Sequence, residues 1–108
     1  MALDVDTLVA AMTQAGEGLA GSVWNQIQTY AGPEFQKIAL QIVAIEQNIG
    51  DYTPDGAKAL LDMQVRASIA VIVGMTSMTL LDVQSALNQV LAAIKTLVNG
   101  ALGFALLA

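Results

Sequence analysis

The residues from Ala67 to Leu81 form an uncharged run, ASIAVIVGMTSMTLL, in a chain of 108 residues. Only two charged residues, Asp82 and Lys95, come after this run. Apolar side chains in such a segment must be removed from water. The segment can cross a membrane, fill the core of its own fold, or pack against other copies of the chain.

The composition favours association over a free monomer. The chain is 56% hydrophobic and only 12% charged, whereas about a quarter of the residues are charged in a typical soluble domain. A domain of this length exposes much of its surface, and few charges are present to cover it. The length suits a single domain over residues 1–108.

Residue types that carry most enzyme chemistry are missing from the sequence. There is no cysteine and no histidine, which removes the thiolate nucleophile, the commonest general base and the commonest metal ligand. We therefore expect no enzyme activity, no cofactor, no metal site and no small-molecule substrate. Four basic residues against nine acidic ones also disfavour binding to nucleic acid.

Apolar residues recur at three- and four-residue spacings along the whole chain, and no alternating strand pattern competes with them. We predict an all-α fold, either a helical hairpin or a three-helix arrangement with a long C-terminal helix. The predicted helices cover about residues 4–30, 33–49 and 54–98 or beyond. Pro33 suits the first turn of the second helix. Gly16, Gly18 and Gly21 weaken the first helix or allow a neighbour to approach closely.

The sequence GDYTPDG contains the clearest turn. Thr53 can cap the following helix, Pro54 suits its first position, and Asp55 suits the positive end of its dipole. We predict that Thr53, Pro54, Asp55 and Gly56 reverse the chain, so that the helices on either side pack antiparallel.

Trp24, beside Asn25 and Gln26, has two interpretations. A buried tryptophan often anchors a binding interface. It can equally pack within its own helical hairpin.

The uncharged run is a poor membrane span. A spanning helix needs about 20 predominantly apolar residues. This run has 15, includes serine and threonine, and meets Arg66 or Asp82 when extended. We favour burial against neighbouring subunits in a homo-oligomer over contact with lipid. The predicted subunit interface consists of Ile69, Val71, Ile72, Met75, Leu80, Val83, Leu87, Val90 and Ile94.

Two stretches resemble the small helical-hairpin proteins that build the needles and inner rods of type III secretion systems. They are LVAAMTQAGEGLAGSV, from Leu8, and TPDGAKALLDMQVRAS, from Thr53, with 16 residues in each. The resemblance implies a secreted subunit that stacks helically into a hollow filament. The chain departs from that pattern by an extra helical segment between Tyr30 and Asp51 and by an uncharged tail after Lys95.

The leading hypothesis is a structural subunit that assembles through apolar helices into a filament, tube or ring. The first alternative is a small membrane-active protein, pore-forming or holin-like, and the second is a helical adaptor that binds one partner helix. The opening residues MALDVDTLVAAM carry acids where a secretory signal carries lysine or arginine. We therefore expect export without a cleavable signal peptide, or a place in a surface or phage-like assembly.

Overall fold

The computed structural model describes residues 3–107, and these form an all-α fold, as predicted. The described part of the chain is 82% helical and contains no strand. The elements are α1 (Val5–Glu17), α2 (Val23–Gln47), the short 3₁₀ helix η1 (Ile49–Asp51), α3 (Pro54–Met75) and α4 (Leu80–Leu102).

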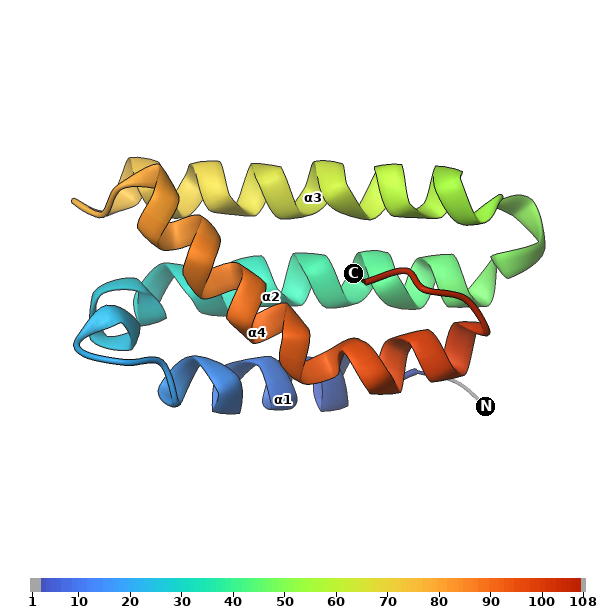
Figure 1. The fold of residues 1–108 in the computed structure, drawn as a ribbon, viewed down its shortest axis with the longest axis horizontal. Helices are drawn as coiled ribbons and strands as arrows, with labels where there is room; N and C mark the ends of the chain where they lie inside the picture. Colours follow the sequence, from blue (N-terminus) through green and yellow to red (C-terminus); the bar gives the residue numbers. More distant parts are fainter. Residues whose placement is uncertain (1–2, 108) are drawn as a thin grey trace.

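Three helices lie side by side, and the fourth crosses them (Figure 1). The middle helix of the layer is α2, which packs between α1 and α3. The fourth helix, α4, runs obliquely from the end of α3 to α1 and contacts all three helices. The molecule measures 40 × 22 × 20 Å.

One hydrophobic core runs between the layer and α4, and every long helix contributes its apolar stripe to it. The largest fully buried side chains are Leu8, Met12, Ile27, Phe35, Ile38, Ile42, Ile45, Ile72, Val83, Leu87, Val90 and Ile94. Their spacing along each helix follows the three- and four-residue pattern of the sequence, which explains why all-α could be predicted.

The predicted continuous helix over 4–30 is wrong, because the chain reverses between α1 and α2. Helix α1 ends at Glu17, and Gly21 adopts a φ of +68° in the connection. A residue with a side chain rarely adopts this conformation, so glycine favours the turn here. The reversal places α2 antiparallel to α1 (Figure 1).

Trp24 packs inside this hairpin. Its ring stacks on that of Phe35, with the ring centroids 6.1 Å apart and the planes at 19°. It also lies directly on Gly16, where an added Cβ would overlap the indole Cζ3 atom. Gly16 is therefore the point of close approach between α1 and α2.

Replacing Gly16 with alanine is expected to lower the free energy of unfolding by about 1–3 kcal/mol, because the new methyl group overlaps the indole ring. Gly32→Ala is the matched control, since Gly32 also lies within a helix but an added Cβ there meets open space. This control should raise stability by about 0.5–1 kcal/mol. The free energies of unfolding of both variants can be measured by urea denaturation, with circular dichroism as the signal. Equal effects of the two substitutions would contradict the packing of Trp24 on Gly16.

The predicted helix boundary at Pro33 is also wrong, because Pro33 lies inside α2. Proline removes one backbone hydrogen bond, which leaves the carbonyl of the residue four positions earlier without its donor. Here that residue is Thr29, and both Thr29 and Pro33 are exposed, so water can solvate the carbonyl. The buried residues Ala31 and Phe35 lie on either side of Pro33 in the sequence, and their shared burial favours one continuous helix.

In the turn before α3, Thr53, Pro54 and Asp55 take the positions that the sequence predicts for the start of a capped helix. The Thr53 hydroxyl accepts a hydrogen bond of 3.0 Å from the Gly56 backbone N–H, Pro54 begins the helix, and Asp55 lies in its first turn. Helices α2 and α3 run antiparallel on either side of η1 and this turn (Figure 1).

The predicted single helix from residue 54 to 98 is wrong, because α3 ends at Met75 and α4 begins at Leu80. The Thr76 hydroxyl donates to the Ile72 carbonyl at 2.8 Å and accepts from the Met78 backbone N–H at 3.2 Å. The Thr79 hydroxyl then caps α4 by accepting from the Asp82 backbone N–H. These hydroxyl groups replace helical backbone bonds with local ones and form a fixed corner.

Candidate interaction surface

Large apolar side chains are exposed at the corner between α3 and α4. The exposed fractions are 40% for Val71, 56% for Met75, 60% for Leu80 and 74% for Leu81. We call these four residues the corner patch. Val71 and Met75 lie one turn apart on α3, and Leu80 and Leu81 begin α4 directly after the four-residue connection. None of the residues from Ala67 to Leu81 is charged. Exposed large apolar side chains that are close together along the chain favour an interaction surface.

The predicted interface residues divide into two groups in the structure. Val71, Met75 and Leu80 are exposed. Six others lie in the core of the single chain, each at most 5% exposed: Ile69, Ile72, Val83, Leu87, Val90 and Ile94. Because these six pack against their own chain, a second subunit could contact only the exposed group in this fold.

Among residues 3–107, Leu81 is the most exposed large apolar residue, and the predicted interface does not include it. The sequence feature that indicates the exposure of Leu81 is the helix N-cap at Thr79. Once α4 is taken to begin at Leu80, its core face follows Val83, Leu87 and Val90, and Leu81 falls outside that stripe. The outward position of Leu81 could not be predicted while residues 54–98 were taken as one uninterrupted helix.

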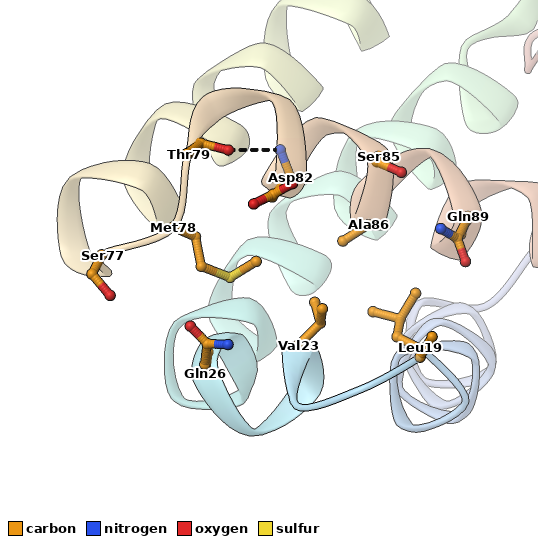
Figure 2. Close-up of a pocket in the computed structure, with 11 residues that line it drawn as sticks. Leu19, Val23, Gln26, Ser77, Met78, Thr79, Asp82, Ser85, Ala86 and Gln89 are labelled. Carbon is orange, nitrogen blue, oxygen red and sulfur yellow. Dashed lines mark hydrogen bonds between the residues drawn. The ribbon is translucent and has the colours of Figure 1, made fainter.

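A cleft of about 400 Å³ opens beside the corner (Figure 2). Leu19 and Val23 close it from the hairpin between α1 and α2, and the Met78 side chain points into the space between α2 and α4. Its polar lining consists of Gln26, Ser77, Thr79, Asp82, Ser85 and Gln89. This lining offers hydroxyl and amide hydrogen bonds around a single carboxylate, Asp82.

One acidic side chain lies among the apolar residues of α2. Glu34 is 3% exposed, and its carboxylate forms an ion pair with the Lys37 ammonium group at 3.0 Å. The lysine keeps its charged end partly in water, with 53% of its side chain exposed. A buried carboxylate needs such a partner. The pair therefore serves to accommodate Glu34 in the fold.

Within residues 3–107, no group of three or more acidic, cysteine or histidine side chains is placed to hold a metal ion. No helix in that range is both long enough and apolar enough to span a bilayer.

Comparisons with protein-family models, with curated proteins and with solved structures found no match to this chain.

Proposed function

We propose that this chain is a non-enzymatic structural subunit that associates with copies of itself through the corner patch. The observation that carries the proposal is the exposure of Val71, Met75, Leu80 and Leu81 on a charge-free segment. Covering such side chains removes apolar surface from water, and each large one contributes roughly 1.5–3 kcal/mol when fully buried.

The fixed geometry of the corner supports the same proposal. Thr76 and Thr79 hold the connection through side-chain hydrogen bonds, so the backbone that carries Leu80 and Leu81 already has its path in the single chain. Association then costs less conformational entropy than it would from a flexible loop.

The resemblance to type III secretion needle and inner-rod subunits suggests the kind of assembly, a helical filament used in protein export. That resemblance rests on the stretches from Leu8 and from Thr53. A role in secretion is a more specific proposal than self-association. Self-association can be tested first, by a simple experiment.

The double variant Leu80→Asp, Leu81→Asp is expected to lose assembly while it keeps its helical circular dichroism. Both side chains are exposed in the single chain, so the carboxylates stay in water unless a second copy covers them. In the assembled state they would be buried without partners, which is strongly unfavourable. Sedimentation velocity and circular dichroism should be read on the same samples.

Leu40→Asp is the matched control, since Leu40 is also an exposed leucine, at 52%, but lies on α2 away from the corner. It should assemble as the unmodified chain does. Unchanged assembly of the double variant would refute the corner patch as the interface. If the unmodified chain instead floats with phosphatidylcholine vesicles and forms no assemblies without them, the membrane-active alternative replaces the proposal.

A further inference from the structure

One end of the molecule is formed by two segments without charge, residues 18–33 and 67–81. The first contains the connection between α1 and α2, and the second contains the corner between α3 and α4. Both connections lie at the same end of the layer (Figure 1). The two segments also line the cleft beside the corner together, with Leu19 and Val23 from the first and Met78 from the second. We call this end of the molecule the corner end.

The opposite end of the molecule is acidic. The Leu3 backbone N–H donates a hydrogen bond to the Glu46 carboxylate, which places the start of α1 beside the last turn of α2. The short helix η1 and the start of α3 follow at the same end (Figure 1). We call this end the acidic end, because its segments carry five acidic residues and one lysine: Asp4, Asp6, Glu46, Asp51, Asp55 and Lys58. Lys95, in the second half of α4, adds one further positive charge.

The corner end has little positive charge to offer to a partner. Arg66 is the basic residue closest to the corner patch in the sequence, and it already forms an ion pair of 2.8 Å with Asp62. Asp82 directly follows Leu81 and lines the cleft beside the corner (Figure 2). Its carboxylate can therefore stay in water when the corner patch is covered. The corner end thus suits an apolar, uncharged partner surface.

We propose that, in the self-association proposed above, the corner end of one copy packs against the corner end of another. The same patch then faces itself across a two-fold axis, as in most dimers. This inference rests on the proposed function and adds which surface of the second copy covers the corner patch. Larger assemblies would be built from such pairs.

The distribution of charge favours this arrangement over a head-to-tail one. Contact between two corner patches buries apolar side chains against apolar side chains. Contact between a corner end and an acidic end would take carboxylates such as those of Asp51 and Asp55 out of water without a free positive charge to receive them, which is unfavourable. Corner-to-corner pairing also leaves the two acidic ends at the far ends of the pair, where their repulsion is weakest.

Opposite charges at Leu80 and Leu81 test the pairing. The acidic variant is Leu80→Asp, Leu81→Asp, and the basic variant is Leu80→Lys, Leu81→Lys. In a corner-to-corner pair, each variant alone brings like charges together and should stay a monomer. An equimolar mixture brings opposite charges together and should associate at least about tenfold more tightly than either variant alone. Native mass spectrometry separates mixed pairs from pairs of one variant by mass, and added salt should weaken the mixed pair.

Leu40→Asp and Leu40→Lys are the matched controls, because Leu40 is an exposed leucine on α2 outside the corner patch. Each should associate alone as the unmodified chain does, and mixing the two should change nothing. Circular dichroism should show the same helical signal for all four variants, since every substituted leucine is exposed in the single chain.

Head-to-tail association predicts the opposite result for the basic variant. Its lysines would meet the acidic end, so the basic variant would associate on its own. That result overturns the corner-to-corner pairing and leaves the corner patch as the interface. Absence of mixed pairs, under conditions in which the unmodified chain associates, also overturns the pairing. If the unmodified chain stays a monomer at every concentration, the proposed function itself fails, and the pairing fails with it.

Discussion

The Ile72→Asp variant is expected to unfold the chain. Ile72 is fully buried in the core, so the substitution removes apolar contacts and places a carboxylate where no partner awaits it. The two effects together should lower the free energy of unfolding by more than about 4 kcal/mol, a large share of the stability of a small domain. Circular dichroism should show a loss of helical signal or a strongly lowered Tm.

The adjacent residue provides the matched control. Val71 is 40% exposed on the other side of the same helix turn, so Val71→Asp should keep its helical signal and should weaken assembly. If both variants keep full helicity, the burial of Ile72 within the single chain is wrong. If both unfold, Val71 belongs to the core and not to the corner patch.

Phe35→Ala is expected to lower the free energy of unfolding by about 3–5 kcal/mol, as is usual for a fully buried aromatic side chain. Phe35 has no exposure and stacks on the ring of Trp24, so its removal leaves a cavity in the hydrophobic core. Leu40→Ala on the exposed face of the same helix should change stability by about 0.5 kcal/mol or less. Chemical denaturation measures both, and a loss below about 1 kcal/mol for Phe35→Ala would contradict the described core.

The fold class could be predicted because apolar periodicity survives any local error in helix boundaries. Ile38, Ile42 and Ile45 recur at helical spacing and are all buried in one core face. The start of α3 at Pro54 could also be predicted, because Thr53, Pro54 and Asp55 are adjacent residues that together favour a helix N-terminus. Both inferences depend only on residues close together in the sequence.

The helix boundaries that failed depend on tertiary packing or on competing local bonds. Pro33 signals a helix start, but burial on both sides of it keeps α2 continuous. The hydroxyls of Thr76 and Thr79 break the last helix, although the apolar period continues through them. Gly21 was read as a weak point of one helix, while its positive φ serves a full reversal.

The candidate interaction surface was predictable only in part, for the same reason. An apolar residue looks alike in sequence whether it faces the core of its own chain or a second copy. Ile72 and Val71 differ only in which side of α3 they occupy, and the three-dimensional fold decides that. The hydrogen bonds between the Asn99 side chain and the backbone of Leu106 and Leu107 could not be predicted, because the sequence signal for them is a single asparagine eight residues before Leu107.

Sedimentation velocity of the unmodified chain, without detergent or lipid and across a wide range of concentration, shows whether copies of the chain cover the exposed apolar corner between α3 and α4. We expect a mass that grows with concentration well beyond the 11.2 kDa of one chain. A single species of that mass at every concentration would contradict it.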